Sequence, residues 1–97
     1  GAVSIDASDW FYNLKYLSYQ KQGKTAQLNQ LKQAYIHHLL GRATYYDQLA
    51  TETLGYSPKH VLLLHVNAIN AAFLTDVIQA FRVQGWQWID TIFRGWS

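Results

Sequence analysis

The chain has 97 residues, of which 49% are hydrophobic, 15% aromatic and only 14% charged. This composition excludes an intrinsically disordered chain, and the length allows one hydrophobic core. The formal net charge of +2 is too small for the basic surface that neutralises a phosphate backbone, so we expect no nucleic-acid partner. No apolar run approaches the roughly 20 residues that cross a bilayer, so we expect a single unit over 1–97 without a membrane span.

Sequence patterns predict a strand and two helices in the first part of the chain. Val3–Asp6 alternates apolar and polar residues, as a half-buried strand does. A helix is expected over about 10–22, where Gly23 follows as a stop signal. A long second helix is expected over Thr25–Leu54, because apolar residues recur there close to the 3.6-residue helical period.

The second part of the chain predicts a strand, a helix and a further strand. His60–His65 is an apolar run with polar ends, which is typical of a strand covered on both faces. Asn70 is expected to cap a third helix that ends at Gly85, and residues 86–91 alternate as a strand does. The order β-α-α-β-α-β predicts a helix-rich α/β fold with parallel strands. Its two exposed sheet edges predict self-association, and we expect the chain to be part of a larger protein.

Polar side chains follow both of the first two predicted strands, at the end where α/β folds place reactive groups. Asp6 and Asp9 follow the first strand, and His65 and Asn67 end the second. If the two strands are neighbours, Asp9 and His65 face each other. A carboxylate stabilises a neighbouring imidazolium, so His65 would be ready to donate a proton as a general acid. Trp10 and Leu63 would form the walls of this pocket.

Each of these residues also has a structural alternative. Asp6 and Asp9 could cap a helix, as could Ser8, and a histidine at the end of an apolar strand could be purely structural. His60 is an odd number of residues from His65, which places it on the opposite face of the strand.

Other histidines and the tryptophans suggest no catalytic group. His37 and His38 are adjacent on a helix and cannot bind one metal as an i, i+4 pair does, so we expect them at the surface or in an interface. Trp86, Trp88 and Trp96 either pack in the core or form an aromatic patch suited to sugar stacking.

The two polar motifs resemble the polysaccharide deacetylases of carbohydrate esterase family 4, the chitooligosaccharide deacetylase homology domain. Residues 6–10 read Asp-Ala-Ser-Asp-Trp, which is similar to the family's fourth motif, Asp, two residues, Asp-Trp. Residues 61–65 are similar to its fifth motif, an apolar strand that ends in Leu-x-His. The sequence Leu-Leu-His-Val-Asn-Ala-Ile-Asn over 63–70 resembles a bacterial branch of the family.

The resemblance implies the C-terminal part of a distorted (β/α) barrel that removes N-acetyl or O-acetyl groups from a polysaccharide. It implies that His65 protonates the leaving amine, that Leu63 lines the acetyl pocket, and that Trp10 forms a groove wall. Asp9 would tune the charged network, with Asp6 and Asn67 in support. A divalent metal, most often zinc, would serve the complete protein, for which the family favours a periplasmic or cell-envelope location.

The family's remaining motifs are missing from this sequence. It contains neither the Thr-Phe-Asp-Asp-Gly motif, which supplies the base and a metal ligand, nor the His-x-x-x-His metal motif, nor the motif with a supporting Arg. We therefore expect no cofactor in this chain and no activity from it alone, as a C-terminal fragment of a parent deacetylase. Residues 24–54 would be a helical insertion between the two motifs. The alternative function is a non-enzymatic helical interaction or structural module that uses this helix as its partner surface.

Overall fold

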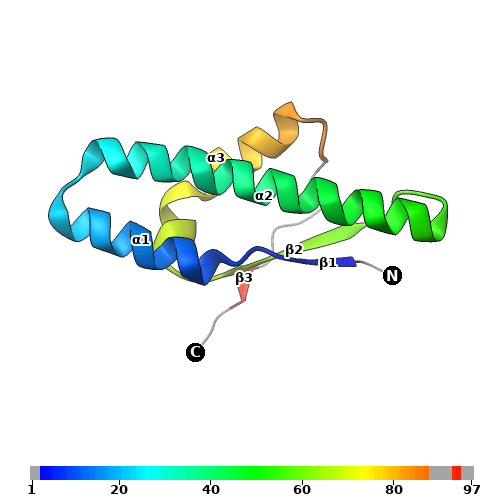
Figure 1. The fold of residues 1–97 in the computed structure, drawn as a ribbon, viewed down its shortest axis with the longest axis horizontal. Helices are drawn as coiled ribbons and strands as arrows, with labels where there is room; N and C mark the ends of the chain where they lie inside the picture. Colours follow the sequence, from blue (N-terminus) through cyan, green and yellow to red (C-terminus); the bar gives the residue numbers. More distant parts are fainter. Residues whose placement is uncertain (1–2, 88–92, 95–97) are drawn as a thin grey trace.

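The structure, a computed structural model, describes residues 3–87 and 93–94 and contains three helices beside a small parallel sheet (Figure 1). In chain order the elements are β1 (Val3–Asp6), α1 (Asp9–Gln22), α2 (Thr25–Leu54), β2 (His60–His65), α3 (Ala68–Val83) and β3 (Phe93–Arg94). The sheet has the strand order β1-β2-β3. β1 pairs with β2 in parallel, with Val3 opposite His60 and Asp6 opposite Leu63. This register brings the carboxyl ends of β1 and β2 to the same edge of the sheet.

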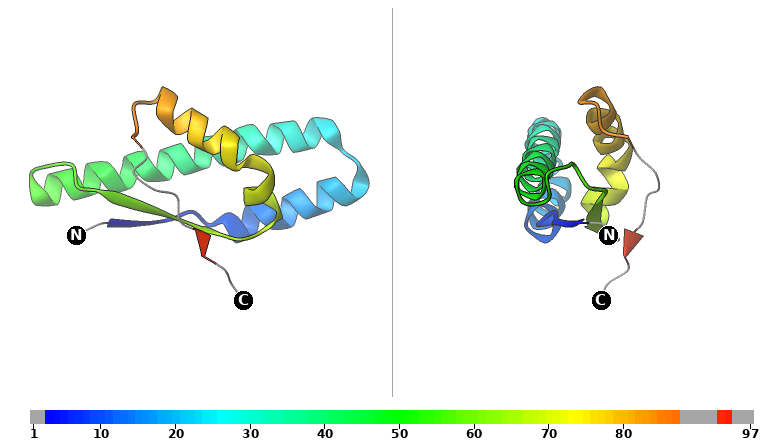
Figure 2. Two further views of the ribbon diagram at one scale, coloured as in Figure 1. Left: turned by 180° about the vertical axis from the view of Figure 1, so that it is seen from behind. Right: turned by 90° about the vertical axis from the view of Figure 1, so that its right-hand side faces the viewer.

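The helices α1 and α2 run antiparallel, and α3 packs across them (Figures 1 and 2). α2 has 30 residues, which corresponds to a length of about 45 Å, and one end of it lies alongside β1 and β2. Gly23 has a φ of 67°, the left-handed conformation that glycine adopts without steric cost, and it lets the chain reverse between α1 and α2. The chain therefore folds its two N-terminal helices into a hairpin.

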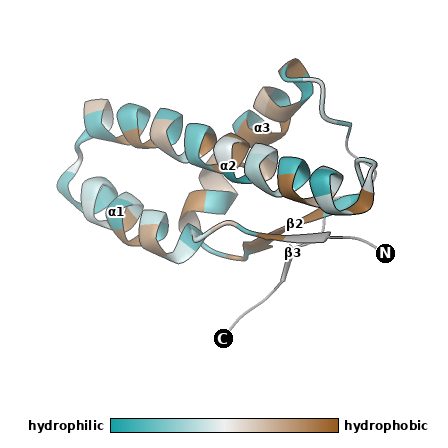
Figure 3. Ribbon diagram, turned by 45° about the vertical axis from the view of Figure 1, so that its right-hand side comes forward, coloured by the Kyte–Doolittle hydropathy of each residue, from teal (hydrophilic) through white to brown (hydrophobic). Residues whose placement is uncertain are grey.

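The core lies where α2 meets the other elements. α2 contributes one inward stripe of buried residues, namely Leu31, Tyr35, Leu39 and Ala43. The same hydrophobic core contains Ile5 of β1, Leu64 of β2 and a row of α3 side chains that includes Ile69, Val77 and Phe81. Figure 3 shows the result, since β2 and much of α3 are hydrophobic while α2 has hydrophilic residues on its outer side. The apolar stripe that predicts α2 is therefore the centre of the fold.

The prediction that the chain forms the C-terminal part of a distorted (β/α) barrel is wrong. Over residues 3–87 and 93–94 the chain forms a small helix-rich unit, and no barrel is present in this part. A barrel wall needs neighbouring strands that pair around a closed circle. Here β1, β2 and β3 have four, six and two residues, and most of the buried apolar side chains belong to the helices α2 and α3 instead.

Most of the predicted elements lie at their expected positions, with two exceptions. The strand predicted over 86–91 is not found at residues 86–87, which are irregular, and 88–91 lie outside the described residues. The helix α3 is capped by Asn67 rather than by Asn70, because Asn67 has the extended backbone of a cap and its side chain accepts the Asn70 N–H. Asn70 lies in the first turn of α3, and its side chain is buried.

Two surface properties bear on partners. Among the helices of the described residues, none is both long and apolar enough to span a bilayer. α1 exposes large apolar side chains on its outer side, with Trp10, Leu14 and Leu17 at 63%, 61% and 44% exposure. Self-association stays a prediction, and this face of α1 is a candidate contact for it besides the sheet edges.

Candidate functional site: a buried carboxylate and a half-exposed histidine

A tight turn between β1 and α1 positions Asp9. Ser8 has a φ of 52° and a ψ of 36°, a left-handed conformation that residues other than glycine rarely adopt. Its N–H donates to Oδ1 of Asp6 at 3.0 Å, so the Asp6 carboxylate stabilises the turn rather than reaching the site. The Ser8 side chain makes no capping hydrogen bond. Asp9 is consequently the first residue of α1, and its carboxylate contacts the end of β2.

The Asp9 carboxylate binds His65 at two points. Its Oδ1 lies 2.8 Å from Nδ1 of the His65 ring, and its Oδ2 accepts the His65 backbone N–H at 2.7 Å. Asp9 is only 1% exposed, whereas the His65 side chain is 53% exposed. Because an ionised carboxylate accepts hydrogen bonds only, Nδ1 carries the proton in this pair. The structure thus brings together the two residues that the sequence predicts to face each other.

A buried amide network holds the other carboxylate oxygen. Asn70, which is 1% exposed, donates through Nδ2 to Oδ2 of Asp9 at 2.8 Å and to the His65 carbonyl at 2.9 Å. Its Oδ1 accepts the Tyr35 hydroxyl of α2 at 2.6 Å. Asn67, besides capping α3, has its Nδ2 3.4 Å from the same oxygen of Asp9. The supporting role expected of Asn67 therefore falls mainly to Asn70.

Sequence reasoning missed Tyr35 and Asn70 as part of this site. Tyr35 lies on the apolar stripe of α2 and reads there as a core residue. The available signal was its hydroxyl, since a fully buried tyrosine usually needs a hydrogen-bond partner. Nothing in the sequence indicates that Asn70, 35 residues further along the chain, is this partner.

The network changes the acidity of two buried groups. Burial raises the pKa of Asp9, but the hydrogen bonds from the His65 backbone, the His65 ring and Asn70, with the charge of His65, outweigh it and lower this pKa below its ordinary value. Burial and the negative charge of Asp9 raise the pKa of Tyr35. Asp9 is therefore an anion at neutral pH, and Tyr35 stays a neutral hydrogen-bond donor.

The lowered pKa of Asp9 predicts a specific acid sensitivity. A carboxyl that is more acidic when folded contributes stability above its unfolded pKa, and this contribution is lost as the pH falls through the folded value. We expect the free energy of unfolding, measured by urea titration, to be steady near neutral pH and to fall below about pH 4.

The control for this prediction is Asp9→Asn, which should be less stable at neutral pH and lose less stability on acidification. Some acid sensitivity should remain, because hydrogen bonds from Ser57 and His60 also lower the pKa of Asp47. An Asp9→Asn protein with the same acid dependence as the original chain contradicts the prediction.

Trp10 and Leu63, the two predicted substrate contacts, flank the pair in different ways. Leu63 is half-buried and lies two residues before His65, which places both side chains on the same face of β2. Trp10 follows Asp9 on the first turn of α1 and is 63% exposed, with its ring edge-on to Phe11. Both are thus near the pair along their own elements, and neither is a fully buried core residue.

Two of the remaining histidines, His38 and His60, have structural partners. His38 does not lie free on the surface, because its Nε2 is 2.8 Å from the Ala7 carbonyl, and Arg42 donates to the Asp6 carbonyl at 3.1 Å. These two α2 side chains hold the turn that positions Asp9. His60 is paired with Asp47 of α2 at 2.8 Å, and its Nδ1 has no hydrogen-bond partner among the described residues.

The described residues contain no group of three or more His, Cys, Asp or Glu side chains that could hold a metal ion. This part of the chain therefore does not fit the zinc ion that the motif resemblance implies. Comparison of the chain with protein-family models, with curated proteins and with solved structures gave no match. Its function is inferred from the geometry of the pair and from the motif resemblance.

Proposed function

We propose that this chain supplies the proton donor, His65 with its partner Asp9, of a hydrolase that removes acetyl groups from carbohydrate, a polysaccharide deacetylase. The observation that carries the proposal is the contact between the buried Asp9 carboxylate and Nδ1 of the half-exposed His65. A core histidine that served packing alone would be buried like His60, whose side chain is 5% exposed. The similarity of residues 6–10 and 61–65 to two deacetylase motifs supports the same function.

In the proposed reaction His65 gives a proton to the leaving amine. Water adds to the acetyl carbonyl, the bond between carbon and nitrogen breaks, and the electron pair of that bond goes to nitrogen. The nitrogen takes a proton from Nε2 of the His65 imidazolium, while Nδ1 keeps its proton and donates it in the hydrogen bond to Asp9. The negative charge of Asp9 stabilises the imidazolium before the transfer, as a buried carboxylate does for a catalytic histidine.

The surroundings of Asp9 support this role by fixing the imidazole. Asn70 and the His65 N–H saturate Oδ2, which leaves Oδ1 directed at the ring. A carboxylate held by several donors keeps its geometry when the ring changes charge, so little reorganisation is needed during proton transfer. Leu63 and Trp10 would contact the acetyl methyl and the sugar, respectively, as the resemblance implies.

The metal ion and the base that activates water are not assigned to this part of the chain. The described residues offer no cluster of metal-ligating side chains, and the sequence lacks the family motifs that carry them. In the proposal these groups belong to a parent protein, and the present residues contribute proton donation and substrate contacts.

The test is acetate release by the protein in the form that its source produces. The substrates are N-acetylglucosamine oligomers and an O-acetylated polysaccharide, with zinc or another divalent ion added. We expect acetate release from at least one substrate, which chelation should abolish and metal should restore. A protein of this form that releases no acetate from either substrate with any divalent ion overturns the proposal.

The alternative, an interaction module that uses α2 as its partner surface, has weaker support. The apolar stripe of α2 is turned inward, since Leu31, Tyr35 and Leu39 are buried in the core of the fold. Substitution of those residues would unfold the chain rather than remove a partner.

A further inference from the structure

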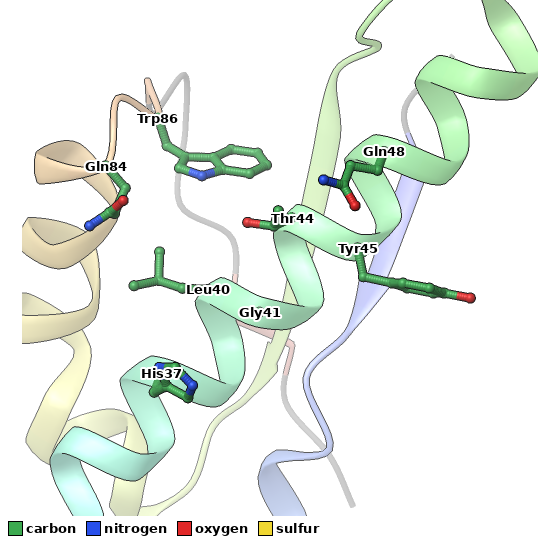
Figure 4. A pocket seen from close by; sticks show the side chains of 8 residues that line it. All are labelled: His37, Leu40, Gly41, Thr44, Tyr45, Gln48, Gln84 and Trp86. Carbon is green, nitrogen blue, oxygen red and sulfur yellow. The ribbon is translucent and has the colours of Figure 1, made fainter.

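A second feature of the molecule lies away from Asp9 and His65. An open hollow of about 510 Å³ is formed by one face of α2 and by the chain at the end of α3 (Figure 4). Its lining residues are His37, Leu40, Gly41, Thr44, Tyr45, Gln48, Gln84 and Trp86. The volume falls within the range of about 300–1,000 Å³ that is typical of small-molecule sites. In α2 these residues lie on a different face from the buried Tyr35 and Leu39.

The hollow has one aromatic wall in a fixed position. Trp86 follows Gly85, whose φ of 91° turns the chain. The backbone N–H of Trp86 donates to the Phe81 carbonyl at 3.0 Å. Its ring is held edge-on by two side chains, with the ring centres of His60 and Phe81 at 5.8 and 5.7 Å. In Figure 4 the Trp86 ring extends over the hollow toward α2, whereas Tyr45 points away from it. A single, held indole ring is the kind of platform that binds a flat apolar face.

The rest of the lining is mostly polar, with Thr44, Gln48, Gln84 and His37 beside the apolar Leu40. The side chains of Gln48 and Gln84 and the hydroxyl of Thr44 provide both donors and acceptors around the Trp86 ring. None of the described lining residues is Asp, Glu, Lys or Arg. Such a site offers no carboxylate, ammonium or guanidinium group to a charged ligand. It fits a neutral ligand that has an apolar face for the indole and hydroxyl groups for the amides, which is the chemistry of a sugar ring.

We propose that this hollow is a saccharide-binding site in which a neutral sugar ring stacks on Trp86 and hydrogen-bonds to Thr44, Gln48 and Gln84. The site goes beyond the proposed hydrolysis and does not depend on it, because Asp9 and His65 take no part in it. A small residue at its floor leaves the space open. Gly41 lies in the middle of α2, and a Cβ atom added there would meet no other atom within 4 Å.

The experiment is an NMR titration of the ¹⁵N-labelled chain with two neutral oligosaccharides, triacetylchitotriose and cellotriose. We expect saturable shifts of the Trp86 indole N–H and of the Gln48 and Gln84 side-chain amides with at least one of them. Gly41→Leu fills the hollow with a side chain and should weaken the binding at least tenfold. It should also raise the midpoint of thermal unfolding, because leucine favours a helix more than glycine does, so a folding defect cannot explain the lost binding.

The matched control is Ala34→Leu, which adds a leucine at an exposed position of α2 outside the hollow. It should leave the affinity unchanged. Absence of saturable shifts with both sugars at millimolar concentration overturns the proposal. Equal affinity of the Gly41→Leu protein and the original chain also overturns it.

Discussion

We expect His65→Ala to lower the rate of acetate release from an N-acetylated oligosaccharide by about 10²- to 10⁴-fold in the active protein. The leaving amine needs a proton from the histidine when the bond between carbon and nitrogen breaks, and alanine cannot supply it. Steady-state kinetics should place the loss mainly in kcat, because the proton transfer belongs to the transition state rather than to substrate binding.

A second substrate separates proton donation from a structural effect. The p-nitrophenolate released from p-nitrophenyl acetate departs without a proton. The rate of hydrolysis of this ester should therefore fall far less in His65→Ala than the rate of acetate release from the oligosaccharide. Val66→Ala is the control, since Val66 is the exposed neighbour of His65 and its side chain has no assigned role. Equal losses on the two substrates contradict the assignment of His65 as a general acid.

Asn70→Leu should cause the largest loss of stability of any single hydrogen-bonding substitution in the site. Leucine has the same branching as asparagine but is larger and apolar, and it leaves Oδ2 of Asp9, the His65 carbonyl and the Tyr35 hydroxyl each without its Asn70 partner. Each buried polar group that loses its partner costs about 1–3 kcal/mol, and a charged one costs more, so we expect a loss of at least about 3 kcal/mol. Urea unfolding at neutral pH measures it.

Tyr35→Phe is the matched comparison for this variant. It removes one hydroxyl and leaves only the Asn70 carbonyl oxygen without its partner, so we expect a loss of about 1 kcal/mol. The double variant should be more stable than the sum of the two losses predicts, because phenylalanine no longer leaves a hydroxyl without a partner. An Asn70→Leu protein within 1 kcal/mol of the original chain argues against the network.

The local structure was largely predictable from the sequence because it depends on local patterns. The 3.6-residue spacing of apolar residues indicates α2, and Gly23 and Gly55 mark helix ends where the backbone has a positive φ. The proximity of Asp9 and His65 was also predictable, since both follow strands and parallel strands align their carboxyl ends. These inferences need only the chain near each residue and one assumption about strand pairing.

The errors concern features that depend on distant parts of the chain. Closure of a barrel depends on how many strands pair and how long they are, which two short motifs do not report. Asn67 and Asn70 are chemically equal candidates for the cap of α3, and only the extended backbone at Asn67 decides between them. The partner of His38 is a backbone carbonyl 31 residues earlier, which has no sequence signature.

The contacts from His38 and Arg42 to the Ala7 and Asp6 carbonyls limit how this chain can be shortened by engineering or by evolution. The two deacetylase-like motifs lie on either side of residues 24–54, which suggests an insertion that a related protein could lose. In the structure the same segment provides the buried helix α2 of the core. It also provides His38 and Arg42, which hold the turn that positions Asp9. A deletion there removes the support of the site together with the core, so α2 and the Asp9–His65 pair can be inherited or transplanted only as one unit.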